Sequence, residues 1–138
     1  MANADRDPPW VVFYGSLMRG LGATLRLGID QRLRFVGPCT VAGELYDLGD
    51  WPGLRTGNGR VVGEIHALLD DEVLGILDGF EDYDAKRPRE SMYLRERVPL
   101  LDSGGGETAW TYVYNQVPDA IARIPHGDWR RWLAERSA

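Results

Sequence analysis

An apolar run that ends abruptly at a glycine constrains the fold of this chain more than any other feature. Residues 11–14, Val-Val-Phe-Tyr, are β-branched and aromatic, and Gly15 and Ser16 follow at once. Such a run is typical of a buried strand, and the glycine lets the backbone turn tightly because it has no Cβ. We expect the amides of Ser16, Leu17 and Met18 to face outward together and form a concave site for a carboxylate or a developing oxyanion. An ordinary strand end with its turn glycine is the alternative interpretation.

Most other apolar runs are short and are separated by glycine and proline, of which the 138 residues contain 17 and 8. This pattern predicts an α+β protein with many strands and turns, folded as a single domain over residues 1–138, with residues 1–9 as a loose leader. Asn58-Gly59 predicts a tight turn between two strands, and residues 103–106 predict a hairpin loop. The expected strands cover residues 32–36, 40–48, 61–68, 92–101 and 107–114, and the expected helices cover residues 73–82 and the segment after Asp128.

Charge and cysteine content exclude several classes of function. The formal net charge of −5 argues against a nucleic-acid partner, because a phosphate backbone attracts clustered Lys and Arg. Cys39 is the sole cysteine, so neither a disulfide framework nor a thiolate metal cluster is expected. The polar start shows no secretory signal, and no apolar run approaches the ~20 residues of a membrane span. We therefore expect a cytoplasmic protein with no membrane partner, and the sequence leaves its oligomeric state open.

A carboxylate on an apolar helical stripe is the sharpest anomaly in the sequence. Glu81 lies four residues after Leu77 and seven after Leu74, which places it on the face that should turn toward the core. Loss of hydration there raises the pKa of a carboxyl group, so Glu81 is a candidate proton acceptor at neutral pH. The alternative is that the helix ends at Gly79 and that Glu81 lies in a surface turn.

The ordered motifs of this chain resemble the gamma-glutamylcyclotransferase-like family, which includes gamma-glutamylamine cyclotransferase and the AIG2-like proteins. Each motif alone is weak, but together they span most of the chain. They are Tyr14-Gly15-Ser16-Leu17, Trp51-Pro52-Gly53-Leu54, Gly63-Glu64, Leu77-Asp78-Gly79-Phe80-Glu81, Tyr93-Leu94-Arg95 and Gly127-Asp128-Trp129.

The resemblance implies a small mixed β-barrel with a few packed helices, in which residues 14–17 and Glu81 line one cavity. It further implies that the loop amides hold the glutamyl part of a gamma-glutamyl amide while Glu81 acts as general acid/base. The substrate amine would then attack its own side-chain carbonyl, releasing 5-oxoproline and a free amine. Such an enzyme needs no metal or cofactor, and its partner is a small gamma-glutamyl molecule.

Three further side chains are candidates near this cavity. Tyr93 and Tyr114 lie on expected strands and are candidates for hydroxyl groups in the pocket, or alternatively for structural aromatic residues. Arg95 is placed to bind a substrate carboxylate or, alternatively, to pair with a neighbouring acidic residue, Glu96 or Asp84. The charged segment 84–91 is expected to overhang the pocket.

Two other functions compete with a cyclotransferase. A serine hydrolase built on Ser16 requires a paired histidine, but Ser16 is not in a Gly-x-Ser-x-Gly elbow. His66 is expected to be structural, and His126 belongs to a Pro-Gly turn. The second alternative is a non-catalytic module that binds a glutamyl-like or other small acidic ligand in the same cavity.

Overall fold

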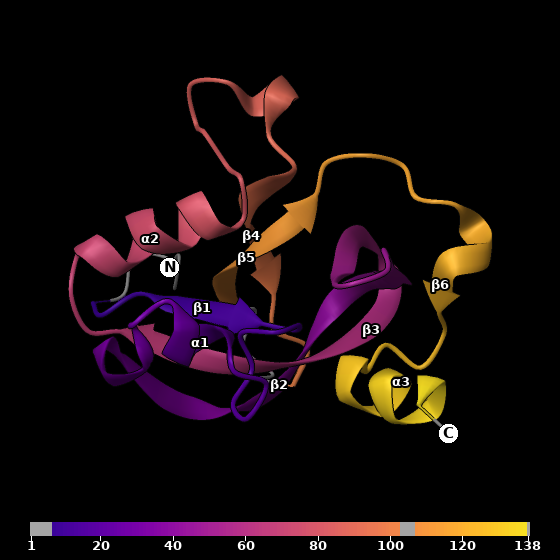
Figure 1. Cartoon of the computed structure of the whole chain (residues 1–138), viewed down its shortest axis with the longest axis horizontal. Coiled ribbons are helices and arrows are strands. Elements are labelled where there is room, and N and C mark those ends of the chain that lie inside the picture. The colour runs from indigo at the N-terminus through magenta and orange to yellow at the C-terminus, as the bar shows by residue number, and fades with distance from the viewer. Residues whose placement is uncertain (1–6, 103–106, 138) are drawn as a thin grey trace.

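The computed structural model describes residues 7–102 and 107–137 (Figure 1). Within these ranges, six strands form one sheet and three α-helices lie against it. The strands are β1 (Trp10–Phe13), β2 (Leu33–Asp47), β3 (Pro52–Leu68), β4 (Tyr93–Pro99), β5 (Thr108–Tyr114) and β6 (Arg123–Ile124), and the helices are α1 (Ala23–Arg26), α2 (Glu72–Phe80) and α3 (Trp129–Arg136). Most of the predicted leader and all of the predicted loop at residues 103–106 lie outside the described residues.

The apolar run at the start of the chain forms a central strand. The order in the sheet is β4-β5-β1-β3-β2-β6, and β1 runs antiparallel to β3 and parallel to β5. Val11, Val12 and Phe13 are almost completely buried, because β1 has a neighbour on each side and is covered on both faces. A continuous apolar strand of this kind suits a position that is shielded from water on both faces.

The predicted α+β class is confirmed, but the sheet is not closed into a true barrel. A contact of β3 with β5 at Leu54 and Val113, and a bridge between Val41 and Leu100, curve the sheet strongly. Closure requires every strand to have two ladder neighbours. Over the described residues β6 has only two residues and pairs with β2 alone, so it does not reach β4 at the other edge.

The tight turn predicted at Asn58-Gly59 is wrong. The chain reverses at residues 48–51, where the Leu48 amide donates to the Trp51 carbonyl at 3.0 Å, and β3 then runs without interruption through residues 58 and 59. The register between β2 and β3 shifts around Gly43, so residues 56–59 bulge out of the ladder. A Cβ on Gly59 would lie 2.7 Å from the Gly43 carbonyl oxygen, so this glycine serves a close backbone approach within a bulge.

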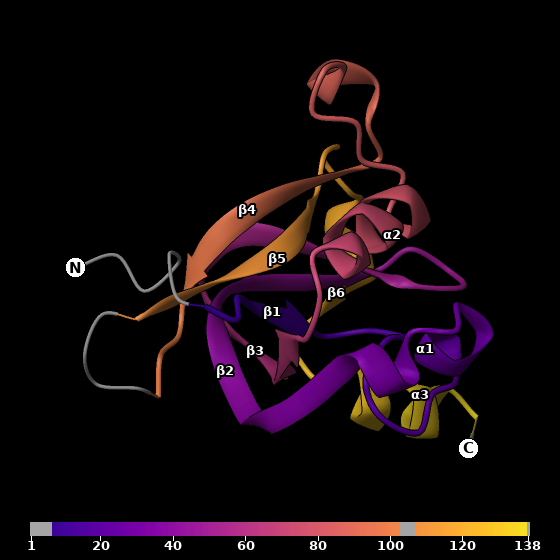
Figure 2. The same ribbon diagram turned by 90° about the vertical axis from the view of Figure 1, so that its left-hand side faces the viewer.

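The two longer helices follow the predicted patterns. α2 buries Val73 and Leu77 against the sheet, and α3 begins after Asp128, whose side chain accepts a hydrogen bond from the Arg131 amide at 3.2 Å. No helix among the described residues is long and apolar enough to cross a membrane. The segment between α2 and β4 projects away from the sheet in both views (Figures 1 and 2).

Candidate active site

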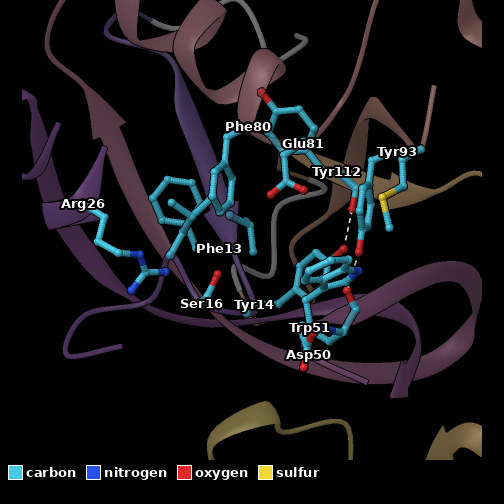
Figure 3. Close-up of a pocket in the computed structure, with 15 residues that line it drawn as sticks. Phe13, Tyr14, Ser16, Arg26, Asp50, Trp51, Phe80, Glu81, Tyr93 and Tyr112 are labelled. Carbon is cyan, nitrogen blue, oxygen red and sulfur yellow. Dashed lines mark hydrogen bonds between the residues drawn. The ribbon is translucent and has the colours of Figure 1, made fainter. Parts of the chain in front are cut away.

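A cavity of about 410 Å³ lies where the loop after β1, the turn between β2 and β3, the end of α2 and the strands β4 and β5 meet (Figure 3). Residues 84–91 do not line it, so the charged segment does not overhang the cavity as predicted. The lining residues are Val12, Phe13, Tyr14, Gly15, Ser16, Leu17, Arg26, Asp50, Trp51, Pro52, Phe80, Glu81, Met92, Tyr93 and Tyr112.

The loop after β1 presents two backbone amides rather than the three predicted. The Met18 amide donates to the Gly15 carbonyl at 3.0 Å and is therefore occupied by the turn itself. The amides of Ser16 and Leu17 have no acceptor among the described residues. Gly15 does not adopt a left-handed conformation, but a Cβ there would lie 2.9 Å from Cγ of Pro52. Glycine is required because Pro52 packs directly against the loop, not because the chain turns.

Glu81 is the residue that follows the last residue of α2. Its amide still donates to the Leu77 carbonyl at 2.9 Å, so the residue keeps a helical position although the helix itself ends at Phe80. The carboxylate points into the space bounded by Tyr14, Ser16 and Tyr93 (Figure 3). No described residue hydrogen-bonds to it, and burial raises the pKa of the Glu81 carboxyl from 4.5 to about 8.

The hydroxyl groups of two tyrosines in the cavity wall are occupied by the backbone. Tyr14 donates to the Tyr112 carbonyl at 2.6 Å and accepts from the Leu54 amide at 3.2 Å, and Tyr93 donates to the Pro52 carbonyl at 2.7 Å. Burial raises the pKa of both phenols, so they stay neutral and shape the wall. The structure places Tyr114 outside the lining residues, where its ring packs against that of Tyr93 at 5.6 Å between centroids.

An ion pair and a hydrogen bond hold the last turn of α2 against the sheet. The Tyr112 hydroxyl on β5 donates to Oδ1 of Asp78 at 2.6 Å, and Nε of Arg95 on β4 lies 3.1 Å from the same oxygen. Nε of Arg95 makes no hydrogen bond, so this contact is an ion pair. Arg95 therefore pairs with neither Glu96 nor Asp84, the predicted partners. The Asp78 side chain is 21% exposed. Asp78 precedes Glu81 by three residues, so the two lie within one helical turn of each other.

A buried carboxylate that does not line the cavity contacts the end of the loop after β1. Glu64 on β3 is 3% exposed and accepts from the Arg19 amide at 2.9 Å and from His66 Nε2 at 3.1 Å, while Arg130 of α3 lies 3.0 Å away. Burial acts to raise the pKa of Glu64, but these donors outweigh it and leave the pKa lowered. Burial also lowers the pKa of His66, which is neutral and lies outside the cavity, in agreement with its predicted structural role.

Several lining residues were not among the predicted site residues and come together only in the folded chain, among them Tyr112, Arg26, Asp50 and Phe80. Phe80 follows the apolar helix pattern and gives no sign that its ring lies at a cavity. Trp51 was noted only as the first residue of the motif Trp51-Pro52-Gly53-Leu54. Among the described residues, no group of three or more His, Cys, Asp and Glu side chains is arranged to hold a metal ion.

Comparison with known proteins agrees with this architecture. Residues 11–131 match the family model described as gamma-glutamyl cyclotransferase, AIG2-like. The gamma-glutamylcyclotransferase family protein YtfP of Escherichia coli K12 is 38% identical over 86 residues, which are 62% of this chain and 66% of that protein.

Two further proteins extend the comparison. The gamma-L-glutamyl-butirosin B gamma-glutamyl cyclotransferase of Niallia circulans is 30% identical over 100 residues, or 72% of this chain and 62% of that protein. The chain thus spans slightly less than two thirds of the length of these curated relatives. The crystal structure of an AIG2-like protein from Mus musculus superposes with a TM-score of 0.66 at 25% identity, covering 88% of this chain and 87% of that one. The family model, which extends over most of the chain, confirms the resemblance seen in the motifs: this protein belongs to the gamma-glutamyl cyclotransferase, AIG2-like family.

Proposed function

We propose that this protein is a cyclotransferase that converts a gamma-glutamyl amide into 5-oxoproline and a free amine, with Glu81 moving the proton. The observation that carries the proposal is the Glu81 carboxylate, which faces the cavity without a hydrogen-bond donor and has a pKa near 8. Family membership supports the same reaction. Among the relatives, the Niallia circulans protein is named for removal of a gamma-glutamyl group from butirosin B.

The loop after β1 supplies the binding site for the glutamyl part. The amides of Ser16 and Leu17 are open to an acceptor, and the α-carboxylate of the substrate takes that position in the proposed complex. The same wall is closed by Tyr14 and Tyr93, whose hydroxyl groups are occupied elsewhere. The glutamyl chain is thereby folded so that its α-amine approaches its own side-chain carbonyl, which replaces a bimolecular encounter by an intramolecular one.

The reaction needs one proton carrier and no water. The Glu81 carboxylate takes a proton from the α-ammonium group, and the free amine forms a C–N bond to the γ-carbonyl carbon. The bond from that carbon to the leaving nitrogen then breaks, and Glu81 gives its proton to the leaving nitrogen. The ring nitrogen still carries one proton more than an amide does, and Glu81 passes this second proton to the departing amine, which leaves as an ammonium ion. The products, 5-oxoproline and the amine, together contain all atoms of the substrate.

The raised pKa of Glu81 matches this role. An α-amino group at a peptide N-terminus has a pKa of about 7.7–8.0, and the free α-carboxylate of a gamma-glutamyl substrate raises the pKa of its amine above that range. With a pKa of about 8, the Glu81 carboxylate comes much closer to balanced proton transfer with this amine than an ordinary carboxylate with a pKa of about 4.3. Burial of Glu81 thus brings the pKa of the base closer to the pKa of the substrate amine.

Release of 5-oxoproline from gamma-glutamyl amines and dipeptides, followed by chromatography, tests the proposal. We expect wild-type protein to release it and Glu81→Gln to lose about 10²–10⁴-fold in kcat. Glu90→Gln, on the segment that projects away from the sheet, is the matched control and should keep wild-type activity.

Two results would decide against the proposal. Equal activity of the wild type and Glu81→Gln would remove Glu81 from the mechanism. Tight binding of gamma-glutamyl compounds without any 5-oxoproline would instead favour the non-catalytic binding module.

A further inference from the structure

The mouth of the cavity differs in chemistry from its interior. Of the lining residues, those exposed to solvent are Arg26, Asp50, Trp51 and Phe80, while the remainder are buried or half-buried. Trp51 keeps 45% and Phe80 41% of its surface exposed, although both are large aromatic residues. The interior and the rim of this cavity therefore offer chemically different surfaces to a bound molecule.

In the proposed complex, the rim lies next to the leaving amine of the substrate. If the glutamyl group lies on the loop amides, as the proposed function requires, its γ-carbonyl lies beside Glu81. The amine attached to that carbonyl then extends from Glu81 toward the solvent-exposed rim. The inference that follows therefore rests on the proposed function and concerns the leaving amine alone.

The two exposed rings favour an apolar, flat group on that amine. Aromatic side chains bury large areas on contact with a second ring and gain more from offset or edge-to-face geometry. Trp51 and Phe80 come from different elements, the turn between β2 and β3 and the end of α2, yet both border one cavity. A small or strongly hydrated amine would leave both surfaces in water.

Arg26 adds a requirement for negative charge. Its side chain makes no ion pair or hydrogen bond with any described residue, and it borders the cavity from α1, directly after the loop that would hold the glutamyl group. A Cβ on Gly22 would lie 3.1 Å from one terminal nitrogen of Arg26, so the glycine leaves room for the guanidinium. A planar guanidinium binds a carboxylate through two parallel hydrogen bonds.

Asp50, the acidic residue of the rim, lies apart from Arg26. Figure 3 shows Arg26 and Asp50 on opposite sides of Ser16, with Asp50 next to Trp51 in the chain. An anion is therefore directed to the Arg26 side of the mouth, and a cationic amine would have to use the Asp50 side.

We propose that the rim selects gamma-glutamyl conjugates of aromatic α-amino acids, with the ring against Trp51 and Phe80 and the carboxylate on Arg26. Polycationic amines are disfavoured because they place positive charge near Arg26 and bury little of the two rings.

Four synthetic conjugates separate the two contributions. Gamma-glutamyl-phenylalanine carries a ring and a carboxylate, gamma-glutamyl-phenethylamine a ring alone, gamma-glutamyl-alanine a carboxylate alone, and gamma-glutamyl-cadaverine a cation. We expect kcat/KM to be highest for the phenylalanine conjugate, with about tenfold losses on removing either group. Arg26→Met should lower kcat/KM about tenfold for the phenylalanine conjugate and change the phenethylamine conjugate less than about twofold.

Trp51→Ala should show the complementary pattern, with about tenfold losses for both ring-bearing conjugates and none for the alanine conjugate. The matched controls are Arg34→Met and Leu69→Ala, which remove an exposed guanidinium and an exposed apolar side chain away from the cavity. Both controls should leave all four kcat/KM values unchanged.

Failure of this inference is distinguishable from failure of the proposed function. Release of 5-oxoproline from all four conjugates at similar kcat/KM, or preference for the cadaverine conjugate that Asp50→Asn abolishes, would overturn the rim assignment while leaving the reaction intact. Calorimetric titration of Glu81→Gln with the same conjugates measures binding without turnover. It should give the same order of Kd, and equal Kd values would contradict the proposal even if no 5-oxoproline were formed.

Discussion

A buried glutamate, Glu64, and a half-buried one, Glu81, have opposite electrostatic environments. Glu64 receives hydrogen bonds from a backbone amide and from side chains, and its pKa is lowered. Glu81 loses water without gaining a donor, and its pKa rises to about 8. Burial acts in the same direction on both groups, so the presence of donors decides which carboxylate remains charged. Only Glu81 is therefore suited to exchange a proton near neutral pH.

The first prediction concerns the pH dependence of catalysis. In a productive complex, the Glu81 carboxyl and the substrate amine together hold one proton that either group can carry. At pH 6 both groups are protonated, and at pH 10 neither is. We expect kcat/KM to peak between the pKa of about 8 for Glu81 and the higher pKa of the substrate amine, and to fall about tenfold per pH unit well beyond the peak on each side. Initial rates between pH 5.5 and 10 check this, and a flat profile from about pH 5.5 to 7 would contradict it.

The second prediction concerns stability. The unfolded Glu81 carboxyl ionises near pH 4.5, whereas the folded one keeps its proton up to about pH 8. The folded state therefore binds more protons in this window, and the contribution of Glu81 to stability is lost as the pH rises through it. We expect Glu81→Gln to exceed the wild type at pH 9 by ~1–3 kcal/mol in free energy of unfolding, and to match it near pH 4.

Urea denaturation at both pH values measures that difference. Glu90→Gln should show none at either pH, because its carboxylate is exposed. A wild type as stable as Glu81→Gln at pH 9 would mean that the carboxyl ionises freely in the fold.

At the level of elements, the position of Glu81 depends on how the end of α2 is held. The residue lies beyond the last helical residue, and Asp82 after it has a positive φ of 54°. The contacts of Asp78 with Tyr112 and Arg95 fix the preceding turn to β5 and β4. The motif around Asp78 and the motif around Arg95 are far apart in the sequence, but in the fold they contact each other through this ion pair.

The third prediction tests this contact. Asp78→Ala removes the contact that holds the last turn of α2 but keeps the Glu81 side chain in the protein, so Glu81 loses its fixed position. We expect kcat to fall ~10–100-fold and KM to change less than ~threefold. Tyr112→Phe, which removes one hydrogen bond, should have a smaller effect. Asp84→Ala, in the projecting segment, is the control. Unchanged kcat in Asp78→Ala, measured well below its unfolding temperature, would show that the contact serves stability alone.

At the level of the whole molecule, Glu64 joins parts of the chain that are far apart in sequence. Its carboxylate contacts the loop after β1 through the Arg19 amide and α3 through Arg130, whose guanidinium also donates to the Arg19 carbonyl. The end of the loop that would hold the substrate is therefore connected to the C-terminal helix α3 through Glu64 and Arg130. Substitutions in this cluster should lower the free energy of unfolding and weaken substrate binding.

The fourth prediction is that Glu64→Gln lowers the free energy of unfolding by ~1–3 kcal/mol, because a buried carboxylate oxygen that accepts hydrogen bonds is replaced by an amide group that donates. The KM for gamma-glutamyl amides should rise as the loop amides shift. Urea denaturation and steady-state kinetics measure the two effects. Glu44→Gln, which removes a half-exposed carboxylate 3.9 Å from Arg123, should cost less than ~1 kcal/mol, and an equal loss in both variants would contradict a special role for Glu64.

Local patterns predicted the buried strand β1, the amphipathic helix α2 and the helix after Asp128, because each depends on side chains within a few residues of one another. The bulge at residues 56–59 was predicted as a turn, because an Asn-Gly pair occurs in both structures and only the pairing of the flanking strands distinguishes them. Tyr114 was predicted at the cavity, whereas the lining residue is Tyr112, two positions earlier on the same face of β5. Strand alternation specifies the face but not which residue along it reaches the cavity.

The sequence by itself determined the class of fold, the family and the identity of the unusual carboxylate, since these follow from residue types at fixed spacing. The tertiary structure alone decided that the sheet stays open, that Gly15 makes room for Pro52, and that Arg95 pairs with Asp78. Those outcomes depend on distances between segments that are far apart in the chain, and no local pattern encodes such distances.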